Sequence, residues 1–310
     1  MNLSTSCILI LLAMAVAVPL YAQGQGAAPC SVLTAASEEM KAAARARVQT
    51  AKVRSELLGR EVAYNLILPH DYAASGLRYP VLYLLHGSYD NHKAWNDKSG
   101  VAAYVAALPL IVVMPDAAMS RYINSPGLGP YEDFFLKEFV PHIDRTYRTL
   151  PRRAGRALAG LSMGGYGAWR LGLDAPETFV AAAALSGSFE WGETGFANER
   201  YRERAIQVYG GEGPEQSRLY AADRLWPHVE KNLGPDVKWR GPALYFTIGT
   251  EDFLLDANRL MRRRMEERKI PFVAAEYPGA HTWAFWDAHV PDALTFILRH
   301  LAAPTGEKGD

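Results

Sequence analysis

The sequence of 310 residues has few cysteines and no excess of charge of either sign. Its two cysteines are Cys7 and Cys30, and Lys plus Arg number 33, as do Asp plus Glu. Balanced charge creates no net field that would attract nucleic acid or an anionic membrane surface, so we expect neither as a partner. If the N-terminal stretch that contains Cys7 is removed, the single remaining cysteine can form no intramolecular disulfide.

Long apolar runs are also scarce, and the clearest one lies at the N-terminus. The run Cys7–Leu20 is shorter than a membrane-spanning helix of about 20 residues, and small and polar residues follow it. This pattern predicts a signal peptide over residues 1–22 and a secreted or periplasmic protein with no stable membrane span. Because no Lys or Arg precedes the run, an uncleaved anchor is the alternative.

The rest of the chain shows no internal repeat, and its pattern predicts one α/β domain over residues 35–301. Residues 23–34 read as a linker and residues 302–310 as a flexible tail. Short, continuous apolar runs indicate strands that are buried on both faces, which is typical of a mostly parallel sheet covered by helices. These runs are 79–85, 108–114, 156–159, 179–185, 243–248 and 271–277.

Other segments complete this outline. We expect a helix over 35–49, a hairpin of 53–57 with 62–68 about Gly59, and helices over 131–147 and 257–268. Residues 190–240 interrupt the alternation of strands and helices. They contain a helix-like stretch, Gln216–Lys231, and we expect them to form an excursion over the sheet edge.

The motif Gly160-Leu161-Ser162-Met163-Gly164 lies between a short strand and a segment, 166–173, that suits a helix. In a strand-to-helix turn of this kind the backbone bends sharply, so small residues are needed on both sides of the serine. The following helix N-terminus favours negative charge that develops at the serine. The alternative is a glycine-rich turn with an incidental serine, so the motif needs catalytic partners elsewhere in the chain.

A serine hydroxyl needs a base, and the base needs an acid that orients it. In an architecture of this kind the order along the chain is Ser, then Asp or Glu, then His, each after a later strand. Asp252 follows the run 243–248, with Glu251 as its near competitor and Asp256 as a more distant one. His281 follows the last predicted strand and precedes a final helix. We therefore predict the triad Ser162, Asp252 and His281.

Hydrolysis through a tetrahedral intermediate also needs backbone donors for the oxyanion. The amide of Met163 is one candidate, and the amide of Ser88 in the loop after the run 79–85 is the other. Gly87 allows a close approach of that backbone. His86 in the same loop reads as a brace, and with His92 it has no matching Cys, His or Asp cluster, so a zinc site is not expected.

Several aromatic residues fall in loops expected to converge on this site. Taken together they predict an aromatic-lined pocket for an acyl or aryl group. They are Tyr89, Trp95, Tyr122, Trp283 and Trp286.

Five separated blocks resemble the putative-esterase family of α/β-hydrolases, which includes esterase D, tributyrin and feruloyl esterases, and mycolyltransferases of the antigen 85 type. The blocks are LLHGSYDNHKAW, SPGLGPYEDFFLKEFVPHID, GLSMGGYGAW, GTEDFLL and GAHTWAFW, within residues 50–300. The resemblance implies the α/β-hydrolase fold, the same triad and oxyanion amides, no cofactor, and ester hydrolysis through an acyl-enzyme. It also implies a structural role for Glu132.

The function expected is therefore an exported serine carboxylesterase that acts on short acyl or aryl esters of the acetyl or feruloyl type. Its substrate would be a small molecule or an ester linked to carbohydrate. One alternative is an acyltransferase that moves the acyl group to a sugar or lipid alcohol instead of water. Another is a catalytically silent α/β-hydrolase that serves in binding.

Overall fold

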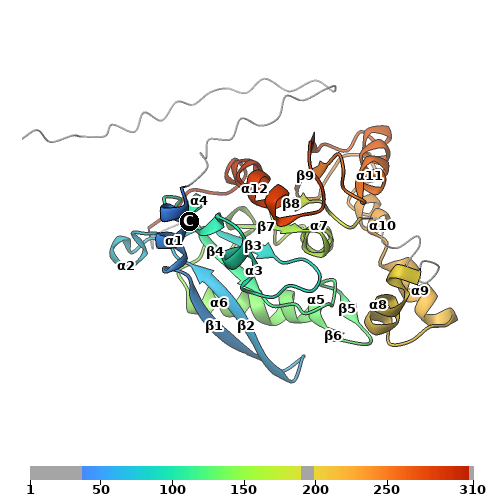
Figure 1. Ribbon diagram of the computed structural model, residues 1–310, viewed down its shortest axis with the longest axis horizontal. Helices are drawn as coiled ribbons and strands as arrows, with labels where there is room; N and C mark the ends of the chain where they lie inside the picture. The colour runs from blue at the N-terminus through green and yellow to red at the C-terminus, as the bar shows by residue number, and fades with distance from the viewer. Residues whose placement is uncertain (1–36, 190–198, 307–310) are drawn as a thin grey trace, which may run out of the picture.

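The computed structural model describes residues 37–189 and 199–306. A sheet of eight strands crosses the molecule in the order β1-β2-β4-β3-β7-β8-β9-β10 (Figure 1). The pairs from β4 through β10 are parallel, whereas β2 pairs antiparallel with β1 and with β4. The strands are β1 Gln49–Ser55, β2 Arg60–Ile67, β3 Val81–Leu85, β4 Ile111–Pro115, β7 Arg156–Leu161, β8 Ala181–Leu185, β9 Ala243–Gly249 and β10 Val273–Tyr277, and a separate small ribbon joins β5 Asn124–Ser125 and β6 Gly129–Pro130.

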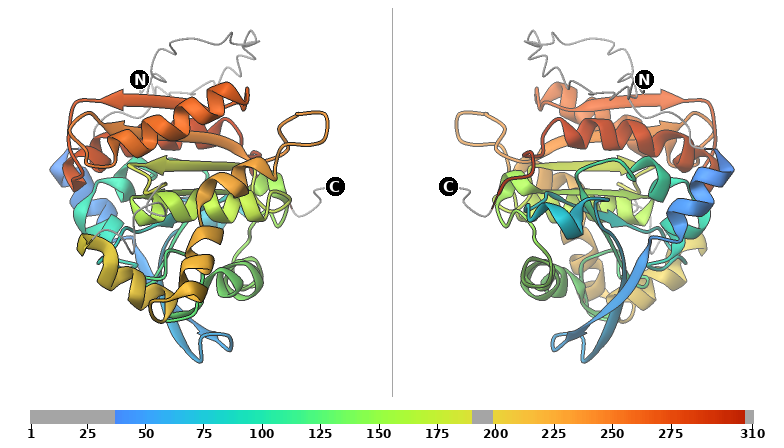
Figure 2. Two further views of the ribbon diagram at one scale, coloured as in Figure 1. Left: turned by 90° about the vertical axis from the view of Figure 1, so that its right-hand side faces the viewer. Right: turned by 90° about the vertical axis from the view of Figure 1, so that its left-hand side faces the viewer.

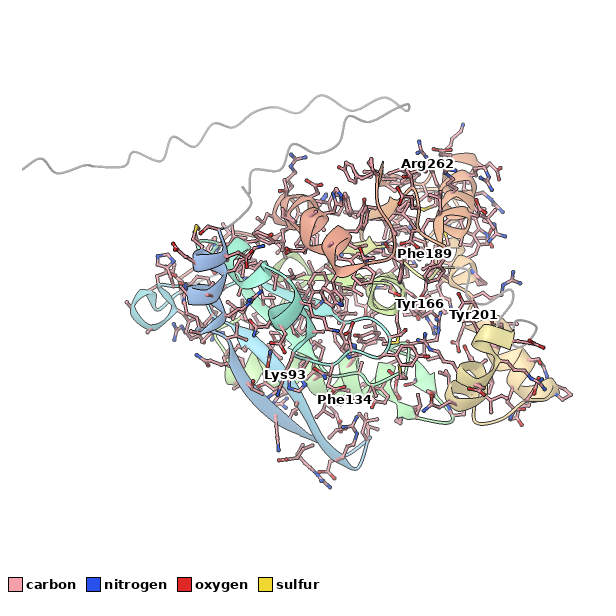
Figure 3. The ribbon with its side chains drawn as sticks, in the orientation of Figure 1. Lys93, Phe134, Tyr166, Phe189, Tyr201 and Arg262 are labelled. Atoms are coloured by element: carbon pink, nitrogen blue, oxygen red, sulfur yellow. The ribbon has the colours of Figure 1, made fainter. Side chains whose placement is uncertain are left out.

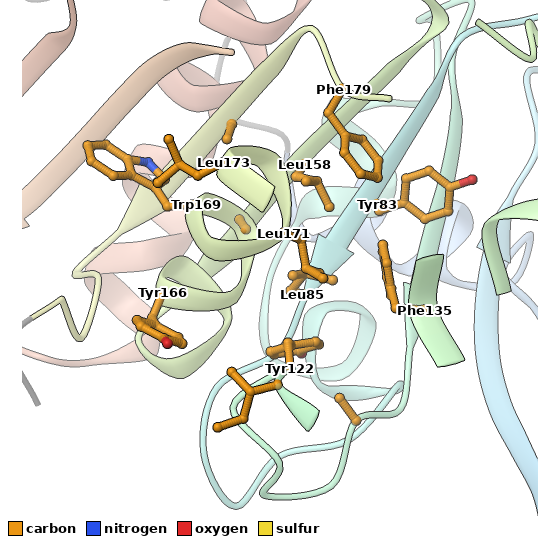
Figure 4. Packing of buried hydrophobic residues seen from close by; sticks show 14 of the residues in the cluster. Tyr83, Leu85, Tyr122, Phe135, Leu158, Tyr166, Trp169, Leu171, Leu173 and Phe179 are labelled. Carbon is orange, nitrogen blue, oxygen red and sulfur yellow. The ribbon is translucent and has the colours of Figure 1, made fainter. Parts of the chain in front are cut away.

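The central strands are buried on both faces, as their continuous apolar runs predict. In β3, Tyr83 and Leu85 point into the core on one face of the sheet, and Leu82 and Leu84 point into the core on the other. Figure 4 shows the first of these cores, where Tyr83 and Leu85 pack with side chains such as Leu171. The predicted mostly parallel sheet with a helical layer on each face is confirmed.

Helices cover both faces of the sheet (Figure 2). The helices α7 and α11 and the segment from α5 to α6 pack into the first core, and α4 and α12 pack into the second. Their bounds are α1 Glu38–Arg45, α2 Tyr72–Ser75, α3 Ala94–Lys98, α4 Val101–Tyr104, α5 Tyr131–Asp133, α6 Val140–Thr146, α7 Met163–Asp174, α8 Glu199–Tyr209, α9 Pro214–Ala222, α10 Leu225–Glu230, α11 Leu255–Glu267 and α12 Trp283–Leu298.

The N-terminal boundary differs from the prediction. The first helix ends at Arg45, and the chain is already extended at Gln49, where β1 pairs with Leu66 of β2. The predicted hairpin about Gly59 is present, with Gly59 at a φ of +65°, but its first strand is longer than expected. Pairing along the whole of β2 supplies hydrogen bonds that the local helical pattern cannot offer.

The predicted helix over 131–147 is one continuous helical segment with a change of register. Between α5 and α6, residues Phe134–Phe139 form a π-helix, η1, in which the amide of Val140 reaches back to the carbonyl of Phe135. Pro141 follows at the start of α6. Proline has no N–H to donate to the preceding helical turn, so the change of register coincides with a break in regular α-helical bonding.

The excursion packs against the end of the sheet near α7 and not over the sheet's outer edge. The carbonyl of Val208 on α8 accepts bonds from the Gly127 amide and the Ser125 hydroxyl, 3.1 Å and 2.5 Å away. The Tyr166 hydroxyl on α7 donates to the carbonyl of Asp223 at 2.6 Å. The helix-like stretch 216–231 forms two helices, α9 and α10, which are separated by a break at Asp223.

The tail predicted over residues 302–310 begins later than expected. The amide of Ala302 donates to the carbonyl of Ala154, and Thr305 forms an antiparallel bridge with Arg78. These backbone bonds hold the chain against the domain as far as Thr305, although its composition is that of a loop. The predicted signal peptide and linker lie outside the described residues. Within 37–189 and 199–306, no helix combines the length and the apolar character needed to cross a membrane.

Candidate active site

Ser162 lies in a sharp turn between β7 and α7. Its backbone has φ +52° and ψ −114°, a conformation that side-chain-bearing residues adopt rarely and usually at functional sites. The turn requires both flanking glycines: a Cβ on Gly160 would collide with the carbonyl of Gly164, and a Cβ on Gly164 would collide with the carbonyl of Leu85. The turn therefore presents the serine at the carboxyl end of the sheet, as the motif predicts.

The structure brings the three predicted triad residues together from three loops. The Oγ of Ser162 is 3.0 Å from the Nε2 of His281, and the Nδ1 of His281 is 2.8 Å from the Oδ2 of Asp252. The second oxygen of Asp252, Oδ1, accepts the amide of Leu254 at 2.9 Å. In the tautomer that carries its proton on Nδ1, the Nδ1–H donates to the carboxylate, and Nε2 accepts from the serine hydroxyl.

The choice among the three candidate carboxylates is decided by burial and direction. Asp252 is 4% exposed and faces the imidazole. Glu251 and Asp256 are exposed to solvent. Two aromatic rings flank the imidazole of His281: Trp286 packs against it edge-on at 4.8 Å between ring centroids, and Phe253 lies 4.5 Å away. The packing fixes the ring's orientation between the serine and the carboxylate.

The loop that carries Ser88 lies against the nucleophile turn. A Cβ added to Gly87 would be 3.6 Å from the Cβ of Ser162 and would overlap the end of the Leu161 side chain, which would have to move. Met163 is the first residue of α7, and amides in the first turn of a helix have no acceptor within the helix. The two predicted oxyanion donors, Ser88 and Met163, are thus on backbone that adjoins Ser162, and their role stays a prediction.

His86 braces this loop from inside, as expected. Its Nδ1–H donates to the carbonyl of Gly87 at 2.7 Å, and its Nε2 accepts the amide of Ala117 at 3.0 Å. The hydroxyl of Tyr122 donates to the His86 carbonyl at 3.0 Å. The arrangement requires a neutral imidazole, and burial lowers the pKa of His86 accordingly.

The free energy of unfolding is expected to fall as the pH drops below about 6.5, in part through His86. The unfolded chain binds a proton on His86 near its ordinary pKa of 6.5, whereas burial lowers the pKa in the folded protein, so acid favours unfolding. Urea unfolding at several pH values measures the slope. The variant His86→Gln should flatten it, and His70→Gln, at an exposed position, should not. An unchanged slope in His86→Gln would contradict this account.

Three of the five aromatic residues predicted to line a pocket are buried. Trp95 and Tyr122 are each 1% exposed, and both polar atoms are bonded inside the protein, Trp95 to the carbonyl of Leu85. Both belong to the scaffold, because packing between the loop and the sheet buries them. Trp286 is 6% exposed and supports His281, with its ring nitrogen bonded to the hydroxyl of Ser186.

Two of the predicted aromatic residues keep exposed surface near the site. Tyr89 is 84% exposed directly after Ser88, and Trp283 is half-buried against Trp95 and the ammonium of Lys98. Phe253, which is 53% exposed beside His281, was not among the predicted residues. Its position directly after Asp252 was the available signal.

A buried arginine ties the nucleophile helix to its surroundings. Arg170 on α7 pairs with Glu132 of α5 at 3.3 Å and with Asp223 of the excursion at 3.0 Å, and its Nε contacts Asp174. Its side chain is 9% exposed. Glu132 therefore has the structural role that the family resemblance implies.

In the described part of the chain, no group of three or more His, Cys, Asp or Glu residues could hold a metal ion.

Comparisons with known proteins agree on an esterase. The family model described as "Putative esterase" matches residues 55–297. An esterase of Mycobacterium tuberculosis is 30% identical over 257 residues, which cover 75% of this chain and 55% of that protein. The chain thus spans about half the length of that relative.

Two further similarities extend the comparison. An acetyl esterase of Caldicellulosiruptor saccharolyticus is 26% identical over 221 residues, covering 70% of this chain and 83% of the relative. A solved ferulic acid esterase superposes with a TM-score of 0.70 at 28% identity, covering 82% of this chain and 98% of the other. The family model matches most of the chain, and the structure has the same fold as that solved esterase. The chain therefore belongs to the putative esterase family of α/β-hydrolases.

Proposed function

We propose that this protein is a serine carboxylesterase that works through an acyl-enzyme on Ser162. The observation that carries the proposal is the unbroken chain of contacts from the Ser162 hydroxyl through His281 to the buried Asp252. A serine at a strained strand-to-helix turn, with base and acid in this order, is the arrangement that activates a hydroxyl for attack. Membership of an esterase family supports carboxylic esters as the substrate class.

The chemistry follows from these positions. Nε2 of His281 takes the proton as Oγ of Ser162 attacks the ester carbonyl, and Asp252 stabilises the imidazolium that forms. The amides of Met163 and Ser88 stabilise the oxyanion. When the intermediate collapses, His281 returns the proton to the leaving alcohol. Water then attacks the acyl-enzyme by the same route, with His281 as its base, and releases the acid and the free serine.

Within this class we propose short acyl or aryl esters of the acetyl or feruloyl type. The relatives support this choice, because one is named an acetyl esterase and a structural neighbour is named a ferulic acid esterase. The exposed rings of Tyr89 and Phe253 next to the site offer surfaces for an aryl group. We also propose export, which rests on the apolar run Cys7–Leu20.

Hydrolysis of p-nitrophenyl acetate, followed by labelling with an alkyl fluorophosphonate, tests the proposal. The protein should release p-nitrophenol with water as the only acceptor, and the phosphonate should stop turnover and appear by mass spectrometry as one adduct on Ser162. Turnover that requires an added sugar or lipid alcohol would favour the acyltransferase. A folded protein with neither turnover nor adduct would favour the silent binding protein.

A further inference from the structure

The loop that follows β8 supports two members of the proposed triad. The amide of Ser188 donates to the carbonyl of Ser162 at 3.1 Å. The hydroxyl of Ser186 in the same loop accepts the ring N–H of Trp286, which packs against the imidazole of His281. Ser186 is fully buried and has a φ of +49°, a backbone conformation that side-chain-bearing residues rarely adopt. This loop, the β8 loop, therefore supports the nucleophile directly and the base through a tryptophan.

The side chain of Asn258 joins the β8 loop to the loop of the acid. Asn258 lies on α11 and is fully buried. Its Nδ2 donates to the carbonyl of Gly187 at 2.9 Å and to the carbonyl of Leu254 at 3.0 Å. Phe189 and Arg262, labelled in Figure 3, mark the β8 loop and the helix that carries Asn258. One buried amide thus reaches a segment that lies 71 residues away in the sequence.

The Leu254 end of this bridge holds the carboxylate of the triad. The amide of Leu254 donates to Oδ1 of Asp252 at 2.9 Å, while Oδ2 of the same carboxylate faces the Nδ1 of His281. The N–H of Leu254 thus positions Asp252, and its carbonyl is held by Asn258. Hydrogen bonds and short stretches of backbone therefore join Asp252 to the β8 loop by a route that does not pass through the imidazole.

The two acceptors determine how the amide group of Asn258 is oriented. Both are carbonyl oxygens, so the NH2 end of the amide, and not its oxygen, must face them. The oxygen, Oδ1, is buried and has no hydrogen-bond partner within residues 37–189 and 199–306. A buried acceptor without a partner costs free energy of folding. A residue that breaks this rule of stability is typical of a functional position.

Neither carbonyl depends on the side chain of Asn258 for a hydrogen bond. The Gly187 carbonyl also accepts the amide of Phe189 at 2.9 Å, and the Leu254 carbonyl also accepts the backbone amide of Asn258 at 3.0 Å. Removing the side-chain amide would leave both carbonyls with a donor, and apolar atoms of similar shape can take its place at little cost in stability. What would be lost is the link between the two loops.

Resting on the proposed ester hydrolysis, we propose that Asn258 is a positioning residue of this reaction. Its amide holds Leu254, and with it the carboxylate of Asp252, at a fixed place relative to the loop that supports Ser162. In the proposed mechanism Asp252 orients His281 and stabilises the imidazolium that forms. A carboxylate that is free to shift would stabilise the imidazolium less, which slows both acylation and deacylation and leaves the binding of the ester unchanged.

The variant Asn258→Leu tests this proposal in the hydrolysis of p-nitrophenyl acetate. It removes both side-chain hydrogen bonds and keeps a side chain of similar shape. We expect kcat to fall about tenfold or more, while KM and the midpoint of urea unfolding stay close to the wild-type values. A residue with a merely structural role would instead lower the unfolding midpoint.

The matched control is Asn232→Leu. Asn232 is also buried, and its Nδ2 also donates to two carbonyls, those of Leu173 at 2.8 Å and His228 at 2.9 Å. Leu173 lies near the C-terminal end of α7, the opposite end of that helix from Ser162. The control makes the same chemical change away from the triad, so it should keep wild-type kcat.

A double variant shows whether Asn258 acts through Asp252. The readout is the rate at which an alkyl fluorophosphonate labels Ser162, followed by mass spectrometry, because this rate reports only the reaction at the serine. Asn258→Leu should slow labelling about tenfold in the otherwise unaltered protein and change it little in Asp252→Asn, since residues that act as one unit are not additive. A residue that acts independently of Asp252 would cause the same fractional loss in both backgrounds.

The outcomes separate this inference from the function on which it rests. If the wild type neither hydrolyses the ester nor is labelled, the proposed esterase function fails. If the wild type is active and Asn258→Leu keeps its kcat, the positioning role is wrong while the esterase stands. The same fractional loss of labelling with and without Asp252→Asn would overturn the positioning role as well.

A second variant, Asn258→Asp, carries the test if Asn258→Leu is poorly folded. A carboxyl group has nearly the same shape as the amide but at most one proton to donate, so it can keep at most one of the two hydrogen bonds. We expect kcat below that of the wild type. Wild-type kcat in this variant would contradict the proposal.

Discussion

Replacing Ser162 with alanine is expected to lower kcat for p-nitrophenyl acetate by about 10³-fold or more. The alanine removes the hydroxyl oxygen that lies 3.0 Å from Nε2 of His281 and that attacks the ester in the proposed mechanism. The turn itself should survive, because its shape is set by Gly160 and Gly164 and by the bond from the Ser162 amide to the Leu185 carbonyl. Initial rates with purified protein, together with an unfolding curve, measure the two effects.

Two comparisons show whether the loss comes from a cooperating triad. Ser217→Ala, at an exposed position on α9, should keep wild-type turnover. The double variant Ser162→Ala with His281→Ala should lose little more than Ser162→Ala alone, because residues that act as one unit are not additive. Full activity in Ser162→Ala would exclude the acyl-enzyme on this serine.

Replacing Arg170 with methionine is expected to lower the free energy of unfolding by about 3–5 kcal/mol. The arginine side chain is 9% exposed and is shared by Glu132, Asp174 and Asp223, from three different segments. Burial alone lowers the pKa of Arg170, but Tyr166, Glu132 and Asp223 raise it above its usual value. Without the arginine, Glu132 and Asp223 lose a cation that offsets their desolvation, whereas Asp174 keeps its contact with Lys231.

Urea unfolding of Arg170→Met beside Arg262→Met measures this effect. Arg262 pairs with Glu266 one turn away on α11, but its side chain is 39% exposed, so the control should change stability by only about 0.5 kcal/mol or less. An equally small loss in Arg170→Met would show that water or repacking compensates the three carboxylates.

The central strands and the turn at Ser162 were predictable because the sequence signals for both are local. Continuous apolar runs identified β3, β4, β7, β8, β9 and β10. In the first five of these strands both faces are covered, so there is no polar side to alternate with. The turn at Ser162 was predictable from Gly160 and Gly164, because no larger residue fits at those two positions. His281 followed from its place after the last strand of the sheet.

Other features depended on contacts between distant segments, which local pattern does not contain. The boundary at Gln49 was misplaced because the pairing with β2, and not helical spacing, decides where α1 ends. Trp95 and Tyr122 were assigned to the pocket although packing against the sheet buries them. The sequence predicted helical structure within residues 190–240, but it did not predict that this segment packs against α7.

By itself, the sequence determined which segments form the central strands, where the turn at Ser162 lies and which histidine follows the last strand. Each of these features depends on residue types within a few positions of one another. Only the tertiary structure decided that Asp252 and not Glu251 faces His281, since the two differ in direction and burial and not in chemistry. It alone also placed Asn258 beside the carbonyl of Gly187 and Arg170 among three carboxylates. Charges separated by tens of residues interact only after the chain has folded, and their energies depend on distance and burial, which no local pattern records.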